Sequence, residues 1–342
     1  MVGFSEVLGA LIDASIFGTI LALMSAGLAL TYSVSRIANF AHGDYAVAGI
    51  MGYLAATLAL SGNLLPESLK PLPFSPLTYI KLLVSFLFAG LVATLTFLLV
   101  YRPLRLRGAG PLQLMVASIG VELVLRYAFH IWYLFMVGSM QISAGIYGPI
   151  ASVAGVAINF NDVLPWVVAA AVVAALVLFF TQTMVGVSLR ATADNRDLAE
   201  ASGINTDVLE IIAWFIGGGL AGLGGVLWFL WTTPAIPIVE SGWLLLAFVF
   251  ASVTLGGLGS IFSSMIAAYI IALAYYPVSE IIIPALQSLG VPVDVGLGYM
   301  VPLIVVIISL LVMPEGLAPH LNKLWLRLEE AWKRWRYESI GI

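Results

Sequence analysis

The stretch "ILALMSAGLALTYSVSRIANFAHGDYAVAGIMGYLAATLAL", residues 20–60, decides the fold class of this chain. Two long apolar runs flank a short polar segment. The polar residues of that segment are Arg36, Asn39, His42 and Asp44. A helix needs about 20 mostly apolar residues to cross a hydrocarbon core about 30 Å thick. We therefore expect two membrane-spanning helices that are joined by a polar break.

The composition extends this expectation to the whole chain. Of its 342 residues, 61% are hydrophobic and only 9% are charged, whereas a soluble domain carries about 25% charged residues. Apolar runs such as "VVAAAVVAALVLFF", residues 167–180, do not alternate as the strands of a membrane barrel must. We predict an all-α, polytopic membrane protein with eight or nine transmembrane segments, some broken or re-entrant.

Nine segments are candidates for crossing the membrane. They cover residues 7–33, 44–61, 78–101, 111–135, 164–184, 208–231, 243–258, 260–280 and 299–314. Only the turn "GGLGS" separates the segments 243–258 and 260–280, so two full spans and a re-entrant element both fit this pair.

The distribution of lysine and arginine gives the orientation. Eleven of the fourteen basic residues fall in connections on one side or in the C-terminal tail. The positive-inside rule places that side in the cytoplasm, so we expect a multi-pass protein of the cell membrane, with its N-terminus outside and its C-terminus inside. The N-terminal "MVGFSEVLGA" lacks a basic n-region, which favours a permanent first helix over a signal peptide.

Two regions follow from this map: a transmembrane domain over residues 1–315 and a cytoplasmic tail over residues 316–342. Apolar residues recur at helical spacing in the tail, with charges on the other face, as in a helix that lies on the inner membrane surface. These apolar residues are Leu321, Leu324, Trp325, Leu328 and Trp332. The outer segments 61–77 and 136–163 are rich in turn-forming residues and predict external loops or short re-entrant pieces.

The cytoplasmic loop 186–207 contains the second informative stretch, "GVSLRATADNRDLAEASGIN". Asp194 is placed to cap a short helix, with an acid three residues later in the manner of a capping box. "NRDLAEAS" then supplies about two turns, and Gly203 supplies a C-cap. Asn205 or Thr206 can cap the following membrane helix. The loop is therefore predicted to be a defined helix.

The chain lacks the motifs of the common catalytic classes. It has no "GxxxxGK[ST]", which excludes ATP binding by a Walker loop in this chain. It has no "HExxH" or "GxSxG", no cysteine, and three histidines in separate regions. We therefore expect no enzyme activity, no bound metal and no cofactor in this chain.

Three motifs occur in a characteristic order: "NFAHGD" at 39–44, the loop segment at 186–205 and "LGGLGS" at 255–260. Together they resemble the permease subunits of the branched-chain (hydrophobic) amino-acid family of ABC importers. "NFAHG" is similar to one of the two paralogous permeases that usually pair in such importers. The resemblance covers about residues 8–314, and Asp44 stands where the family commonly has Glu.

The resemblance implies a set of partners and a mechanism. The partners are a second paralogous permease, two cytoplasmic ABC ATPase subunits, an external substrate-binding protein and membrane lipid; no nucleic acid is expected. Closure of the ATPases would move the cytoplasmic loop and open a path between the permeases by alternating access. Branched-chain or hydrophobic amino acids are the default solutes, while relatives of this permease are associated with urea and short amides.

Two breaks predict the translocation path, because transporters often build their paths from broken helices in corresponding positions. The segments 30–60 and 248–276 share an apolar run, a glycine-bearing break and a returning helix, which indicates a loose internal repeat. The polar residues of the first break can satisfy the freed backbone groups, and Asp44 can cap the returning helix. The path candidates are Asn39, Phe40, His42, Gly43, Asp44, Tyr45, Gly256, Gly257, Gly259 and Ser260.

The resemblance also implies that the cytoplasmic loop docks into the ATPase. The coupling candidates are Arg190, Asp194, Asn195, Arg196, Asp197, Ala201, Gly203, Ile204 and Asn205. Glu122 and Arg126 form an i,i+4 pair, for which we expect an intramembrane ion pair that faces the bundle interior; a role in substrate binding is the alternative. A stand-alone carrier or channel is the rival class. A coupled carrier would need buried acids along its path, and Asp13 and Glu122 are the main ones.

Overall fold

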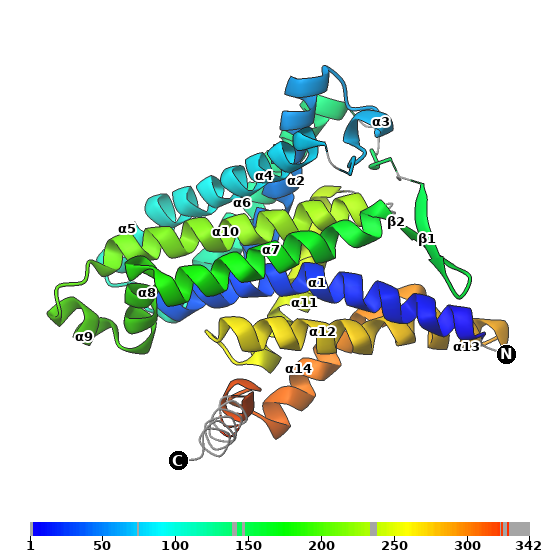
Figure 1. The fold of residues 1–342 in the computed structure, drawn as a ribbon. Coiled ribbons are helices and arrows are strands. Elements are labelled where there is room, and N and C mark those ends of the chain that lie inside the picture. The colour runs from blue at the N-terminus through cyan, green and yellow to red at the C-terminus, as the bar shows by residue number, and fades with distance from the viewer. Residues whose placement is uncertain are drawn as a thin grey trace, which may run out of the picture.

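The computed structural model describes residues 3–73, 75–138, 142–145, 148–232, 238–321, 323 and 327, and it is a bundle of long helices (Figure 1). The first half comprises α1 Phe4–Ser35, α2 His42–Ser61, α3 Pro66–Leu69, α4 Pro76–Thr96, η1 Phe97–Tyr101, α5 Arg102–Leu106 and α6 Pro111–Val137. The middle comprises β1 Pro149–Val153, β2 Val156–Asn159, α7 Phe160–Gln182, α8 Met184–Asp194 and α9 Arg196–Ala201. The rest comprises α10 Thr206–Trp231, η2 Ile238–Glu240, α11 Ser241–Gly256, α12 Ile261–Pro277, η3 Val278–Ile282, α13 Ile283–Ser288, η4 Val295–Tyr299 and α14 Met300–Val312.

The prediction of an all-α, polytopic membrane protein is confirmed. Within the described residues, eight helices are long and apolar enough to cross a membrane. The ninth predicted segment, 299–314, coincides with a shorter apolar helix over Gly296–Val312. The closely spaced pair consists of two helices of spanning length, Ile238–Gly256 and Ile261–Ser288, which agrees with two full spans.

Short elements gather at the end of the bundle where α1 begins (Figure 1). The loop before α4 contains the short helix α3, and the loop before α7 contains an antiparallel hairpin of β1 and β2. The hairpin turns at Ala154 and Gly155, both with positive φ (51° and 85°). The sequence analysis predicted only loops or re-entrant pieces here and missed the hairpin.

Small residues allow the central helices to approach closely. Along α10, glycines recur at three- and four-residue spacing, and a Cβ on them would collide with neighbouring helices. Gly217 lies against the Gly27 backbone of α1, and Gly222 lies against Gly49 of α2. Such small-residue spacing lets helices pack backbone to backbone within lipid. As a result, α2 and α10 are the most buried of the long helices, with 78% and 72% of their most apolar windows inside the chain.

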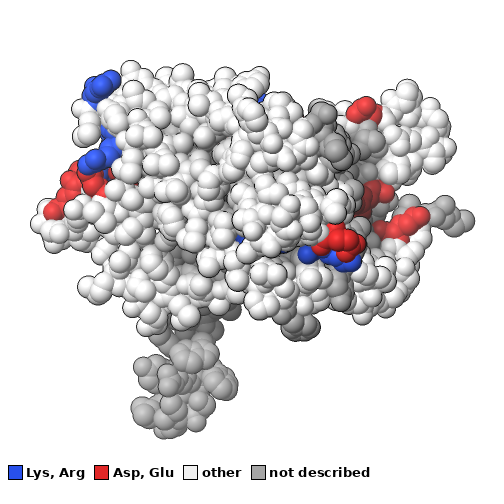
Figure 2. All heavy atoms as spheres, turned by 90° about the horizontal axis from the view of Figure 1, so that it is seen from above, with Lys and Arg blue, Asp and Glu red and all other residues white. Residues whose placement is uncertain are grey.

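Charged side chains are unevenly distributed on the surface. On the face in Figure 2, lysine, arginine and acidic residues gather toward the two ends of the bundle, and the broad surface between them is almost free of them. An uncharged belt between two charged ends is the pattern of a bilayer-embedded protein. The amphipathic tail predicted for 316–342 lies largely outside the described residues, as do its apolar residues after Leu321.

Candidate functional site

The first break is organised by the buried side chain of Asn39. Its Oδ1 accepts hydrogen bonds from the Ala41 backbone N–H at 3.1 Å and from the Tyr101 hydroxyl at 2.9 Å. Its Nδ2 donates to the Tyr45 hydroxyl at 3.3 Å, which is itself hydrogen-bonded to Thr96 at 2.6 Å. The expectation that polar residues satisfy the backbone of the break is therefore confirmed for Asn39.

The returning helix α2 begins at His42, whose imidazole is fully buried. Its Nε2 lies 2.9 Å from the Met24 carbonyl oxygen of α1, which accepts a hydrogen bond. Gly43 lies directly against the backbone of Gly242 in α11, where a Cβ would collide. Phe40 packs on Phe250 of the same helix, with ring centroids 4.9 Å apart. The first break is thus held between α1 and α11.

Asp44 does not cap α2, so that prediction is wrong. The N-cap is Ala41, Asp44 is the third helical residue, and no side-chain cap hydrogen bond forms at the start of α2. The carboxylate is 1% exposed, and neither of its oxygens accepts a hydrogen bond from any residue that the structure describes. Asp44 is therefore a buried acid without a hydrogen-bond partner among the described residues.

The second break, Gly256–Ser260, forms a tight turn between α11 and α12. Gly257 and Gly259 have φ values of 102° and 89°, which only glycine adopts readily. A Cβ on Gly259 would lie 3.4 Å from the Ser33 Cα of α1, three residues before the first break. The structure therefore brings the end of α1 and the second break together. The internal repeat itself stays a prediction.

The short helix α9 forms in the loop 186–207, as predicted, with one correction at its start. Asn195 is the N-cap, and its side chain accepts a hydrogen bond from the Leu198 N–H at 3.0 Å; Asp194 is instead the last residue of α8. Gly203 has a φ of 83°, in agreement with its predicted capping role. Asn205 caps α10 by accepting from the Val208 N–H at 3.2 Å.

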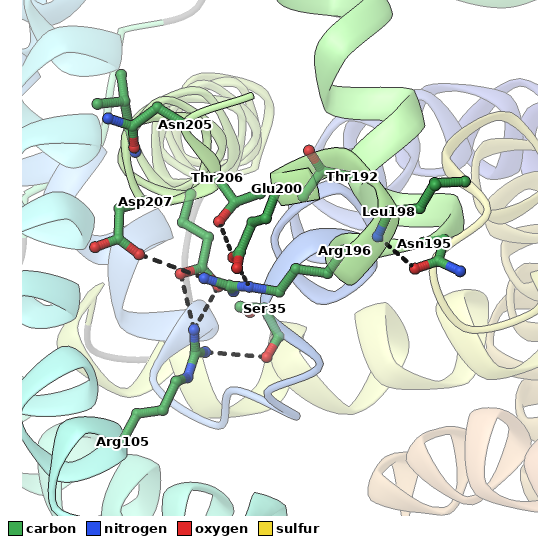
Figure 3. Close-up of polar contacts among 12 residues, drawn as sticks. Ser35, Arg105, Thr192, Asn195, Arg196, Leu198, Glu200, Asn205, Thr206 and Asp207 are labelled. Carbon is green, nitrogen blue, oxygen red and sulfur yellow. Dashed lines mark hydrogen bonds and ion pairs between the residues drawn. The ribbon is translucent and has the colours of Figure 1, made fainter. Parts of the chain in front are cut away.

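A network of ion pairs and hydrogen bonds ties α9 to α10, α5 and the end of α1 (Figure 3). Its centre is Glu210 of α10, which is 1% exposed. Arg105 of α5 donates to both Glu210 oxygens at 2.6 and 2.8 Å, and Arg196 of α9 approaches Glu210 at 3.0 Å. Arg105 also donates to the Ser35 carbonyl at the end of α1, at 3.1 Å. The Glu210 carboxylate thus links Arg196 of α9 to Arg105, and Arg105 in turn contacts Ser35, the last residue before the first break.

The outer contacts of Arg196 strengthen this arrangement. Arg196 pairs with Glu200 at 3.0 Å and with Asp207 at 3.3 Å. Burial disfavours the charged form of Arg196, but the nearby carboxylates outweigh it and raise its pKa. The pKa of Glu200 lies below its usual value, because the Thr206 hydroxyl donates to it at 2.5 Å and Arg196 pairs with it. Arg196 therefore stays charged at neutral pH.

Sequence reasoning missed Arg105 and Glu210, although both are central to the network. The available signal was an acid in the first turns of an apolar segment, where charge is expensive unless it is paired.

A second link to the break, through Arg36, was also not predicted from the sequence. Arg36 has a φ of 55° and donates to the Ala193 carbonyl of α8 at 2.9 Å. A cavity of about 300 Å³ lies between these residues and is lined by Ser33, Val34, Ser35, Arg36, Arg105, Thr192, Ala193, Asp194 and Arg196.

Most of the predicted coupling residues lie on the surface. The exposed ones are Arg190, Asp194, Asn195, Asp197, Ala201, Gly203 and Asn205, while Arg196 and Ile204 are half-buried. Leu198 of α9 is also exposed, at 64%, and was not among the candidates. The loop therefore presents one face outward at one end of the bundle, and Arg196 anchors its other face.

The predicted pair of Glu122 and Arg126 forms an ion pair on α6. The two side chains are 11% and 16% exposed, so the pair is largely buried among the described helices. The Arg126 Nε has no hydrogen-bond partner among the described residues. The ion pair between Glu122 and Arg126 is therefore present in the structure, as predicted.

Known proteins resemble this chain over most of its length. A probable branched-chain amino acid transport permease protein LivH of Methanocaldococcus jannaschii is 29% identical over 310 residues, covering 89% of this chain and 90% of the relative. The high-affinity branched-chain amino acid transport system permease proteins BraD of Pseudomonas aeruginosa and LivH of Escherichia coli are 26% and 25% identical. Their matches cover 77% and 88% of this chain, and 83% and 91% of the relatives.

A solved structure and a family description complete the comparison. PsaBC from Streptococcus pneumoniae, solved in complex with Fab, matches with a TM-score of 0.50 and 15% identity, covering 93% of this chain and 96% of that one, which supports the fold. The family described as "Branched-chain amino acid transport system / permease component" matches residues 10–310. This chain therefore belongs to that family of membrane-embedded transport permeases, which are not enzymes.

Proposed function

We propose that this chain is one permease subunit of an ABC importer that moves branched-chain or other hydrophobic amino acids into the cell. ATP hydrolysis is carried out by two separate cytoplasmic ATPase subunits. An external binding protein delivers the solute, and a second, paralogous permease completes the path. The names of the curated relatives support the solute class.

The observation that carries the proposal is the construction of the coupling loop. Its helix α9 presents an exposed face at one end of the bundle, as a docking element for another protein requires. Behind that face, Arg196 connects through Glu210 and Arg105 to the end of α1. Arg105, Arg196 and Glu210 thus form an ionic junction that contacts Ser35, the last residue before the first break. A force on α9 would act on the break through this ionic junction.

The path is proposed to run beside the two breaks. Asn39 and its partners fix the first turn, and the glycines Gly257 and Gly259 fix the second. The alternating-access cycle would change the packing between these breaks rather than rebuild them. Residues 1–315 would form the permease domain, with the coupling loop 186–207 and the C-terminus in the cytoplasm and the N-terminus outside.

The test is reconstitution of this chain with its candidate partners in proteoliposomes. Uptake of radiolabelled leucine should require ATP inside the vesicles, both ATPase subunits and the leucine-loaded binding protein. Urea and acetamide serve as competing solutes. Leucine uptake without ATPases would support a stand-alone carrier instead, and ATP-dependent uptake of urea but not leucine would overturn the solute class.

A further inference from the structure

Asp44 is an acid whose side chain is buried without a hydrogen-bond partner in the described part of the chain. It lies on α2, the most buried of the long helices, and neither oxygen of its carboxylate has a hydrogen-bond partner among the described residues. Buried polar groups are normally hydrogen-bonded, and buried charges are normally paired. An acid left without partners at the centre of a membrane protein is therefore a candidate for binding something positively charged or hydrogen-donating.

The surroundings of Asp44 supply both signs of charge. Glu122, Arg126 and Glu240 all lie within electrostatic range of it. These residues come from α6 and η2, and both elements pack against α2. Arg126 does not pair with Asp44, because its terminal nitrogen is held by Glu122. The Arg126 Nε is left without a partner among the described residues.

The register between α2 and α6 explains why these groups face one another. The Ser118 hydroxyl of α6 accepts a hydrogen bond from the Phe40 N–H at 3.0 Å and donates to the Ala38 carbonyl at 3.3 Å. Both helices run from the end that holds α9 toward the end that holds α3 (Figure 1). Glu122 lies four residues, about one helical turn, beyond Ser118 in α6. Asp44 lies four residues beyond Phe40, in the first turn of α2, so the two acids lie at a similar depth in the bundle.

The helix that holds the ion pair lies at the periphery of the chain. Only 28% of the most apolar window of α6 is buried inside the chain, against 78% for α2. A charged pair on such a peripheral intramembrane helix is costly unless it faces a polar path or a protein partner. In this structure Asp44 is closed off at 1% exposure. A shift of α6 relative to α2 would open the space between Asp44 and Arg126.

We propose that Asp44 and Arg126 form a recognition site for the zwitterionic head of the transported amino acid. The Asp44 carboxylate accepts hydrogen bonds from the α-ammonium group, and the Arg126 guanidinium donates to the α-carboxylate. Glu122 holds Arg126 in the closed state and is replaced on it by the ligand carboxylate. This site rests on the proposed function, because it presumes an amino-acid solute. The site requires one negative and one positive group, and these are the Asp44 carboxylate and the Arg126 guanidinium.

The experiment measures leucine imported per ATP hydrolysed by the full reconstituted importer. Asp44→Asn and Arg126→Gln each remove one charge at nearly constant size. Each should lower leucine import per ATP by about tenfold or more, because a hydrogen bond between charged groups is lost. Asp44→Glu and Arg126→Lys keep the charges and should restore most of the ratio. ATP hydrolysis stimulated by the loaded binding protein should continue in all four variants.

The matched control is Asp13→Asn, which removes another intramembrane carboxylate. Asp13 lies on α1 about 33 Å along the helix from Ser35 and should leave the ratio unchanged. An unchanged ratio in Asp44→Asn and Arg126→Gln would overturn the site. A parallel loss of assembly, ATP hydrolysis and import that Asp44→Glu does not relieve would assign Asp44 a structural role and overturn it too. A wild-type complex that imports no leucine would refute the proposed function, and the site with it.

Discussion

Replacement of Glu210 by glutamine should loosen the attachment of α9 to the helix bundle. The substitution keeps the shape of the side chain and removes the charge that Arg105 and Arg196 share. Arg105 would then lose its ion pair with Glu210, while Arg196 would keep those with Glu200 and Asp207. The perturbation is therefore confined to the ionic junction behind α9.

The structure allows the size of the effect to be worked out. Removing one partner of a buried ion pair costs about 3–5 kcal/mol. The side chains of Arg105 and Arg196 are 28% and 32% exposed, so water screens part of the loss. We therefore expect a decrease of about 2 kcal/mol in the free energy of local opening of α9. That decrease corresponds to amide exchange about 30 times faster.

The assay is hydrogen–deuterium exchange of α9 in the purified protein, read by mass spectrometry. Glu67→Gln is the control, because Glu67 is an 83% exposed acid whose ion pair with Lys70 spans 3.6 Å at the other end of the bundle. It should leave exchange in α9 unchanged. Exchange in α9 that differs less than about threefold between wild type and Glu210→Gln would refute the role assigned to this junction.

Three further outcomes are expected. Gly203→Ala places a Cβ on a residue with a φ of 83° and should weaken the end of α9 by about 1 kcal/mol, measured by the same exchange assay. Asn39→Ala should lower the free energy of unfolding by about 1–3 kcal/mol, measured by chemical denaturation in detergent, since it leaves the buried Tyr101 hydroxyl and its neighbours without their acceptor. The pKa of Glu200 is lower in the folded protein than its ordinary value of 4.5, because Thr206 donates to the carboxylate and Arg196 pairs with it; these contacts stabilise α9 above about pH 4.5 and are lost as the pH falls through the folded value. Exchange in α9, corrected for intrinsic rates, should rise in that range, and Glu200→Gln should abolish the rise.

The architecture was accessible from sequence because hydropathy and helix length are local properties. Long apolar runs predicted the spanning helices, and the break at residues 36–44 separated the first two. Caps were harder to assign. Asp194 and Asn195 are adjacent and are both good cap residues, and only the extended backbone at Asn195, with φ −152° and ψ 104°, selects the second. Asp44 lost its expected capping role because α2 begins two residues earlier, at His42.

The ionic junction could not be predicted, because it joins residues that are distant in sequence. Arg105 and Glu210 are separated by 105 positions. Nothing in either local pattern specifies the other residue. The same holds for the placement of Arg126 within electrostatic range of Asp44, which depends on the packing of α6 against α2. The motif resemblance singled out the loop and the break, and the three-dimensional packing supplied the residues that connect them.

The central claim is that α9 is the face on which an ATPase subunit docks. The chain contains no cysteine, so a single introduced thiol can carry a photo-reactive cross-linker without background. Leu198→Cys, at a position 64% exposed on α9, should cross-link to the ATPase subunit in the assembled complex. Leu65→Cys, at a position 62% exposed near α3, should not. Cross-linking of the ATPase at position 65, or none at position 198 in a complex that hydrolyses ATP, would contradict the assignment.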